Sequence, residues 1–455
     1  MSSLTQTQQR DVQYQLHSYT NAVTHQRTGP IVIDRGEGVY VYDDQGQRYL
    51  EAMAGLWSVA VGFGEQRLAD AAARQLQKLP YYHTFTHKSH APAIELAERL
   101  IGYTGGRMAK AFFTNSGSEA NDTVVKLVWY YNNALERPEK KKIIARLRGY
   151  HGVTVASASL TGLPGNHKGF DLPLPRILHT ACPHHYRHGQ PGESEEDYAT
   201  RLADELEALI LREGPDTVAA FIGEPVMGAG GVIVPPRTYW QKIQAVCRKY
   251  DVLVIADEVI TGFGRLGQRF GSDVFGIEPD MMVLSKQITS SYQPLGAVLL
   301  NAKVADVVSA HSGKLGTFGH GYTASGHPVA TAVALENLAI IDERGLIEHA
   351  AEMGQLMQQE LRALADHPLV GEIRGVGLIA GVELVADKNT RQPFDPLGKA
   401  GAHAYERAHA HGLIVRGIQD TVAFCPPLVI EADQVRDMVR RFAATLDDVS
   451  AFVAA

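Results

Sequence analysis

Residues 252–258 read Val-Leu-Val-Ile-Ala-Asp-Glu, and residues 281–286 read Met-Met-Val-Leu-Ser-Lys. Both are short apolar runs that end in charged residues. A third run of the same kind, residues 218–225, reads Val-Ala-Ala-Phe-Ile-Gly-Glu-Pro. Such runs are typical of strands buried on both faces of a parallel sheet. Because similar runs alternate with segments of helical period from about Leu56 onward, the sequence predicts an α/β fold with a mainly parallel sheet.

The ends of the chain show other patterns. Residues 38–46 predict a small hairpin, residues 328–342 predict a long helix, and residues 371–384 alternate like strands. Near the C-terminus a stripe at helical spacing predicts a helix with one core-facing side. Its members are Val435, Met438, Val439, Phe442, Leu446 and Val449.

Composition predicts a soluble protein of enzyme size. The chain has 455 residues, is 45% hydrophobic and 20% charged, and carries a net charge of −7, which argues against disorder and against nucleic acid or an anionic membrane as the main partner. Its three cysteines are widely spaced, and we find no signal peptide and no apolar run of membrane-spanning length. We therefore expect a cytoplasmic protein.

Three charged residues follow the three apolar runs, and we expect them to meet at the carboxyl edge of the sheet. They are Glu224, Asp257 and Lys286. One such residue alone is more often a turn or surface group, but three on adjacent strands favour a site. A lysine in a closed cleft can have a depressed pKa and form a Schiff base with an aldehyde. Pyridoxal phosphate needs such a lysine and a carboxylate for its pyridine nitrogen, which Lys286 and Asp257 would supply.

A phosphate site is predicted where the strand at residues 109–114 gives way to Asn-Ser-Gly-Ser-Glu-Ala-Asn at residues 115–121. Small residues at a helix N-terminus leave backbone N–H groups free to bind an anion. The alternative is a plain capping box, because Ser116 and Glu119 have the S-x-x-E spacing. Taken together with Lys286 and Asp257, the phosphate interpretation is the better one.

Two further patterns favour other classes. Residues 262–267 match G-x-G-x-x-G and could mark a dinucleotide-binding dehydrogenase, but the glycines start five residues after Asp257 and no apolar helix follows. The histidines at 83, 87 and 90 and at 184, 185 and 188 have spacings that could bind zinc on a helix. Neither segment is predicted to be helical, so we interpret these histidines as loop residues and predict no metal site.

Several segments in order resemble the class III, or ω-, aminotransferases, which use pyridoxal phosphate. Beside Lys286, Asp257 and residues 114–120, they are residues 53–57, 149–152, 223–225, 256–267, 320–323 and 426–428. The resemblance runs from about Gly36 to Leu446. It implies fold type I, with a doubly wound large domain at residues 59–325 and a smaller α+β domain made from residues 1–58 and 326–455. It also implies a homodimer, or a tetramer, with active sites at the subunit interface.

The resemblance also assigns roles to residues. It implies that Lys286 is the Schiff-base lysine and that Asp257 partners the pyridinium nitrogen. The cofactor-binding residues that it implies are Ser116, Gly117, Ser118, Tyr150, Glu224, Val259 and, toward the other subunit's phosphate, Thr323. The substrate-binding residues that it implies are Trp57, Phe85, Tyr150 and Arg416, the last being a mobile arginine that receives a carboxylate. Gln287 departs from the family, which usually has Gly after the lysine.

The resemblance implies transfer of an amino group from a terminal amine or ω-amino acid to a 2-oxo acid, with pyruvate as the expected acceptor. Diamines, β-alanine or taurine, and aryl amines all remain open as donors. Lys286 would act as general base and acid in the proton shift. An aminomutase or decarboxylase of the same fold is the alternative, and a regulator that only senses the cofactor is disfavoured because the short polar N-terminus offers no DNA-recognition helix.

Overall fold

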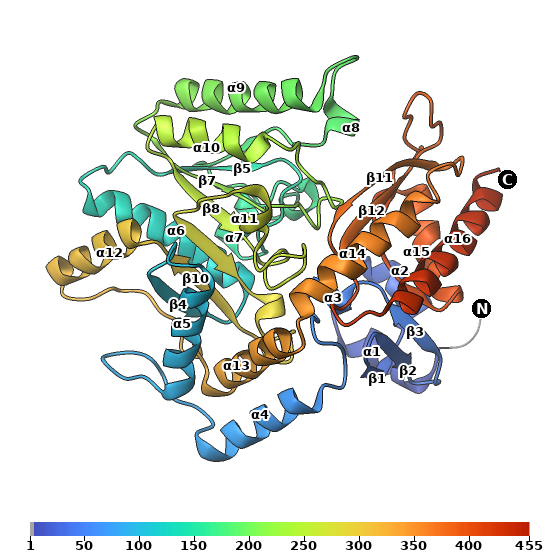
Figure 1. Cartoon of the computed structure of the whole chain (residues 1–455), viewed down its shortest axis with the longest axis horizontal. Coiled ribbons are helices and arrows are strands. Elements are labelled where there is room, and N and C mark those ends of the chain that lie inside the picture. Colours follow the sequence, from blue (N-terminus) through green and yellow to red (C-terminus); the bar gives the residue numbers. More distant parts are fainter. Residues whose placement is uncertain (1–3, 455) are drawn as a thin grey trace.

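The computed structural model describes residues 4–454, and its centre is a seven-stranded sheet (Figure 1). The strand order is β4-β10-β9-β8-β7-β5-β6. The bounds are Lys110–Thr114 (β4), Lys142–Arg146 (β5), Ile177–Thr180 (β6), Val218–Gly223 (β7), Leu253–Asp257 (β8), Met281–Leu284 (β9) and Gly296–Leu300 (β10). The strands from β6 to β9 in this order pair in parallel, and β10 runs antiparallel to β9 and β4. The prediction of a mainly parallel sheet is confirmed.

The three apolar runs form the neighbouring strands β7, β8 and β9, and every residue of these strands is buried. Because the strands are parallel, their carboxyl ends lie at the same edge of the sheet. Glu224, Asp257 and Lys286 therefore come together at that edge, as the sequence predicts.

Helices cover both faces of this sheet. Neighbouring residues of one strand point to opposite sides, so that Ile143 joins an apolar cluster with α6 while Ile144 joins another with α9 and α10. The helices that surround the sheet are α4 (Gln66–Lys78), α5 (Ala91–Tyr103), α6 (Gly117–Ala134), α7 (Val155–Leu160), α8 (His185–His188), α9 (Glu195–Glu213), α10 (Tyr239–Lys249), α11 (Gly271–Phe275), α12 (Ala302–Leu315) and α13 (Pro328–Glu343), with 3-10 turns at η1 (Pro164–Asn166) and η2 (Lys286–Ile288). The arrangement is doubly wound.

Two four-stranded sheets lie outside the central sheet. The first has the order β1-β2-β3-β13, with bounds Ile33–Glu37, Tyr40–Asp43, Arg48–Glu51 and Leu413–Ile414. The second has the order β11-β12-β15-β14, with bounds Val370–Val376, Ile379–Leu384, Thr421–Phe424 and Arg416–Ile418. Since β13 pairs in parallel with β3, the two ends of the chain share one sheet. The domain boundaries at 58/59 and 325/326 stay a prediction.

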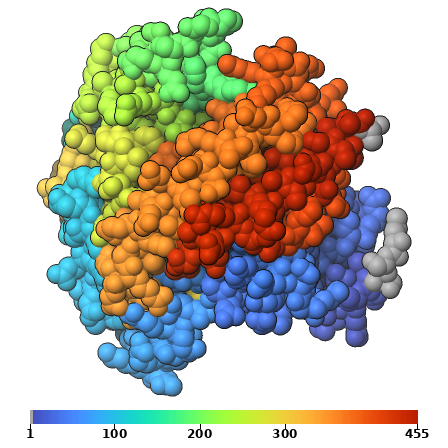
Figure 2. Space-filling model, turned by 45° about the vertical axis from the view of Figure 1, so that its right-hand side comes forward, coloured from blue at the N-terminus to red at the C-terminus, as the bar shows by residue number. Residues whose placement is uncertain are grey.

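The remaining helices belong to the chain ends. They are α1 (Gln6–Tyr14), α2 (Ala22–Thr28), the short kinked α3 (Ala54–Trp57), α14 (Leu346–Arg362), α15 (Lys399–Ala410) and α16 (Ala432–Ala454). All six members of the predicted C-terminal stripe are buried on α16. Figure 2 shows the C-terminal residues adjoining the N-terminal ones on one face of the molecule. Among the described residues no helix combines the length and the apolar character needed to cross a membrane.

The glycine-rich stretch at residues 262–267 forms tight turns that pack against the C-terminal part of the chain. Gly264 has a φ of +105°, and a side chain there would press on Ile347 and Leu428. Gly267 has a φ of +79°, and its missing Cβ leaves room for Ala351 of α14. These glycines allow close approach and left-handed backbone, and the five-residue helix α11 begins four residues later. The stretch is therefore a packing element.

Candidate active site

A cavity of about 130 Å³ opens at the carboxyl edge of β7, β8 and β9. The residues that line it are Ser116, Gly117, Ser118, Asn121, Tyr150, His151, Gly152, Glu224, Asp257, Val259, Ile260, Ser285 and Lys286. Eight of the residues that the sequence singles out are among them. They come from β-strand ends, from the start of α6 and from the loop after β5, so the topology brings together segments that lie far apart in the sequence.

Lys286 follows the end of β9, with a backbone φ of +48°. Its amine donates no hydrogen bond to any described residue. Burial lowers the pKa of the Lys286 amine to about 8, while the negative charges of Asp257 and Glu224 act in the opposite direction. An amine with a pKa this close to neutrality can be nucleophilic and can exchange protons.

Asp257 is held by three hydrogen bonds. Asn121 Nδ2 donates to its Oδ2 over 2.9 Å, and His151 Nδ1 donates to the same oxygen over 2.7 Å. The backbone N–H of Val259 donates to Oδ1 over 3.2 Å. These donors suit a carboxylate, which only accepts. Asn121 and His151 are functional residues that sequence reasoning did not assign, although both lie in segments that it quoted.

Ser116 is the N-cap of α6, an 18-residue helix. Its Oγ accepts a hydrogen bond from Glu119 N. The Glu119 carboxylate, however, accepts from the backbone N–H and the side-chain Nδ2 of Asn115 and not from Ser116 N. The capping box is thus only half formed. The N–H groups of Gly117 and Ser118 donate to no acceptor in the described chain, and they lie on the cavity wall. This helix end fits an anion such as phosphate.

Two glycines keep the walls of this cavity close together. A Cβ on Gly117 would lie 3.2 Å from Val259 Cγ2. Gly152 has a φ of +126°, and a Cβ there would come within 2.5 Å of Ser118 Oγ. The loop after β5 can therefore approach the start of α6 only with glycine at this position.

Glu224 fixes the loop that carries Tyr150. Its carboxylate accepts from Tyr150 N over 3.0 Å and from Gly228 N over 3.0 Å, and burial raises its pKa. The pKa of the Tyr150 phenol is also raised, first by burial and then by Tyr19, whose side chain lies beside it. Tyr19 is a third residue that sequence reasoning missed, since it lies in a polar N-terminal segment without a recognisable motif.

Gln287, which departs from the family pattern, is buried and ties the lysine turn to the glycine-rich stretch. Its Nε2 donates to the carbonyl oxygens of Ile260 and Gly262 over 2.8 and 2.9 Å. The backbone carbonyl oxygen of Gln287 accepts from Asn337 Nδ2. Gln287 therefore cross-links the backbone on two sides of the site.

We expect Gln287→Leu to lower the free energy of unfolding by at least about 2 kcal/mol, because each buried carbonyl that loses its donor costs about 1–3 kcal/mol. Chemical denaturation of the cofactor-loaded enzyme measures this. Gln77→Leu, on the exposed face of α4, is the control and should change stability little. Equal stability of the wild type and Gln287→Leu would contradict this role.

Arg416 lies in β14, and its guanidinium pairs with no carboxylate of the described chain. Its positive charge acts on Lys286 and on Tyr150, lowering the pKa of each. The structure thus brings an unpaired cation close enough to act on Lys286 and Tyr150, and the role of Arg416 as a carboxylate receptor stays a prediction.

Besides Arg416, three predicted residues do not line the cavity. Trp57 is buried with Ile260 and Cys425 in an apolar cluster behind the cavity wall. Phe85 and Thr323 are exposed, the Phe85 ring covers Gly321, and Tyr81 donates to the Thr323 carbonyl. The proposed roles of Phe85 and Thr323 in the partner's site stay predictions.

The turn that carries Trp57 is held by a buried carboxylate that sequence reasoning did not single out. Glu51 accepts the N–H of Met53 over 3.2 Å and that of Gly55. Burial raises the pKa of Glu51 to about 7, and the two backbone donors and Arg265 act in the opposite direction. Glu51 therefore positions this turn.

The two histidine-rich segments differ. Residues 83–87 form no helix, as predicted. The same prediction is wrong for residues 185–188, which form the single turn α8, stabilised where His185 Nε2 donates to the Glu193 carbonyl.

Comparison with known proteins decides the family. The family model for class-III aminotransferases matches residues 21–446. The chain is a class III aminotransferase. It therefore uses pyridoxal phosphate, and the cavity fits this cofactor because it offers a lysine amine, a carboxylate and free helix N–H groups within one set of walls.

Individual relatives support this family assignment. The aminotransferase is 53% identical over 420 residues to a γ-aminobutyrate transaminase of Solanum lycopersicum. This match covers 92% of this chain and 81% of the relative. A solved ω-transaminase of Pseudomonas jessenii in complex with PMP is 64% identical, with a TM-score of 0.98 over 100% of this chain and 99% of the other. A transaminase solved with L-alanine is also 64% identical, with a TM-score of 0.92 over 93% and 100%.

Proposed function

We propose that this aminotransferase moves an amino group from a terminal amine or ω-amino acid to a 2-oxo acid, with pyruvate as the acceptor. The observation that carries this proposal is the unpaired Arg416 guanidinium near the Lys286 amine. The names of the relatives support it, since they include γ-aminobutyrate and ω-transaminases and one complex with L-alanine, the amino form of pyruvate.

Each residue of the cavity has a proposed role. Lys286 binds the cofactor and then holds or delivers a proton at its amine, which its lowered pKa favours. Asp257 keeps a positive charge on the ring nitrogen opposite, while Asn121 and His151 orient its carboxylate. Gly117 and Ser118 donate backbone N–H groups to the phosphate, Ser116 caps the same helix end, and Tyr150 and Val259 confine the ring. When bound, pyridoxal phosphate supplies an aldehyde for the lysine and a ring that withdraws electrons.

Arg416 is proposed to read the substrate carboxylate. A guanidinium pairs bidentately with a carboxylate, and the same side chain can swing outward when the substrate is an apolar or cationic amine. One pocket would then accept both an amine without a carboxylate and an amino acid that has one.

We expect Arg416→Ala to weaken the pyruvate half-reaction by roughly 10- to 150-fold in kcat/KM, because a charged hydrogen-bonded contact contributes about 1.5–3 kcal/mol. The half-reaction with a diamine or aryl amine should change little. Single-turnover spectroscopy separates the two half-reactions. Arg416→Lys is the matched control, since it keeps the charge and loses the bidentate geometry, and it should fall between the two. Equal losses in both half-reactions would show a structural role.

An aminomutase or a decarboxylase of the same fold is the alternative, because the same lysine and carboxylate serve those reactions. Incubation with an amine donor and pyruvate separates the candidates. An aminotransferase forms alanine in an amount equal to the amine consumed. A decarboxylase releases carbon dioxide, and an aminomutase returns an isomer of its substrate without alanine.

We also propose a homodimer, or a tetramer built from it, in which Phe85 and Thr323 contact the partner's site. Both residues are exposed in the single chain and do not line its cavity, which supports this arrangement. A cytoplasmic location stays a prediction, and several relatives bear mitochondrial or chloroplastic names.

A further inference from the structure

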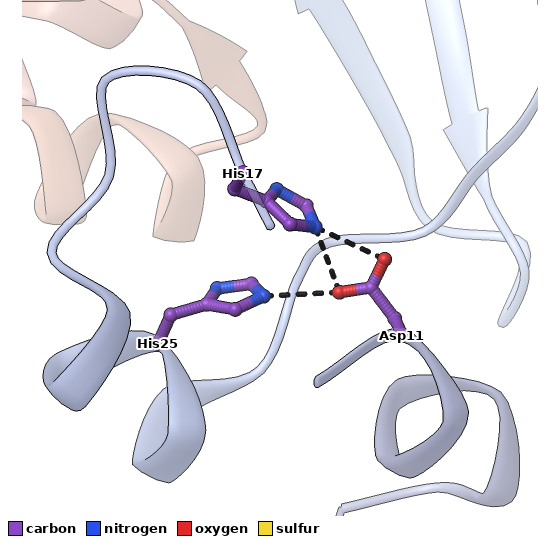
Figure 3. A group of neighbouring side chains, drawn as sticks. All are labelled: Asp11, His17 and His25. Atoms are coloured by element: carbon purple, nitrogen blue, oxygen red, sulfur yellow. Dashed lines mark hydrogen bonds and ion pairs between the residues drawn. The ribbon is translucent and has the colours of Figure 1, made fainter. Parts of the chain in front are cut away.

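Three side chains from the N-terminal segment converge outside the active site (Figure 3). Asp11 lies on α1, His25 on α2 and His17 on the segment that connects them. His17 Nε2 donates to Asp11 Oδ2 over 2.8 Å, and His25 Nε2 donates to the same oxygen over 2.9 Å. The three side chains are largely buried, with exposed fractions of 17% for Asp11, 26% for His17 and 11% for His25.

The charge of this cluster is not balanced by a lysine or arginine. Within the described residues, Asp11 forms ion pairs with the two histidines alone. A second group, His184 with Glu372 and Glu383, has a similar composition. There Arg374 lies 2.6 Å from both carboxylates, and Arg187 also binds Glu383. Because arginines already satisfy those carboxylates, the second group is an ion-pair network, whereas the first is free to bind a cation.

The geometry of the first cluster suits a transition-metal ion. One ligand atom from each residue lies within 4.8 Å of the others. Tetrahedral zinc with bonds of about 2.0 Å places its ligands about 3.3 Å apart, so small rotations would suffice. A cavity of about 270 Å³ borders His17 and His25 and has room for a water as the fourth ligand.

We propose that Asp11, His17 and His25 bind a divalent transition-metal ion of the zinc class, which takes the place of the proton at each Nε2 while each neutral imidazole carries its one proton on Nδ1. Two imidazoles and a carboxylate are ligands of this class of metal. The family model begins at residue 21, so Asp11 and His17 lie outside the span that it matches. The ion would correct the sequence-based prediction that the protein has no metal site.

The site also has a structural connection to the cavity. Tyr19 lies between two of the ligands in the sequence, and its hydroxyl accepts from Asn166 Nδ2 over 2.5 Å. The Tyr19 side chain also lies beside that of Tyr150, and Tyr150 lines the active-site cavity. A metal ion bound by Asp11, His17 and His25 therefore fastens the segment that carries Tyr19.

The test uses full-length, cofactor-loaded enzyme without an affinity tag, after treatment with a chelator and dialysis. Isothermal titration with Zn²⁺ should show one site per chain, and Co²⁺ should give the visible absorption of a tetrahedral site. His17→Gln and His25→Gln should each weaken binding by at least about 100-fold, since even partners beyond the ligands contribute 10- to 100-fold. Zn²⁺ should also slow hydrogen exchange of residues 6–28 in the wild type and not in His25→Gln.

His403→Gln is the matched control, because His403 stacks on Phe452 far from this cluster in the sequence and has no carboxylate partner among the described residues. It should bind Zn²⁺ like the wild type. Wild-type affinity in both His17→Gln and His25→Gln, or no stoichiometric binding to the wild type, would overturn the proposal and leave a hydrogen-bonded cluster. Because the readouts are metal binding and exchange, failure here leaves the proposed transamination untouched.

Discussion

Lys286→Ala should lower kcat by about 10⁴-fold or more, because it removes both the nucleophile and a general acid–base whose contribution alone is about 10²–10⁴-fold. The physical basis is a buried amine with a pKa of about 8 and no protein partner in the described chain. Steady-state assays with an amine and pyruvate measure the loss. In the wild type, borohydride reduction followed by peptide mapping should place a pyridoxyl label on Lys286.

Lys242→Ala is the control for this experiment, because Lys242 forms a surface ion pair with Glu196 and should be dispensable. Circular dichroism of Lys286→Ala establishes that the fold persists. A label on another lysine, or no label on cofactor-saturated wild type, would end the assignment of Lys286.

Asp257→Asn should lower the rate of both half-reactions by about 10²–10³-fold, the size of the effect when a preorganised electrostatic partner is removed. A neutral amide cannot hold a positive charge on the ring nitrogen, so the ring becomes a poor electron sink. The substitution should also disturb the local hydrogen bonds, because Asn121 and His151 donate to one oxygen of this carboxylate and Val259 N donates to the other. Single-turnover rates and the absorption spectrum of the bound cofactor give the measurement.

Asn121→Ala separates charge from orientation. It removes one donor to Asp257 and keeps the carboxylate, so we expect a smaller loss than in Asp257→Asn, together with retained cofactor. A loss of only a few-fold in Asp257→Asn would mean that another group fulfils this role.

The sequence predicts the central sheet and the core of the site well because both follow from one pattern. The buried strands β7, β8 and β9 have no polar position before the final Asp257 of β8, so their ends are visible as the points where charge appears. Parallel pairing then places Glu224, Asp257 and Lys286 at one edge. A local sequence pattern is enough to locate these residues, because the parallel pairing of the strands determines where the strand ends lie.

Other features could not be predicted, because they depend on pairs that are distant in the sequence. Asn121 and His151 lie 136 and 106 residues from Asp257, and neither has a local signal that it would face a carboxylate. Gln287 reads as a departure from the family and proves to be a buried cross-link. Tyr19 comes to lie beside Tyr150 only through the path of a polar segment.

The pairing of β3 with β13 has a consequence for biosynthesis. Leu50 pairs with Leu413, which is 413 − 50 = 363 residues later. At a translation rate of about 5–20 residues per second, the ribosome needs roughly 20–70 s to make the residues between them. During that time the nascent hairpin of β2 and β3 lacks its neighbour and exposes an open strand edge. The N-terminal sheet is thus among the first segments synthesised and among the last completed, and a chaperone that shields it has that interval in which to act.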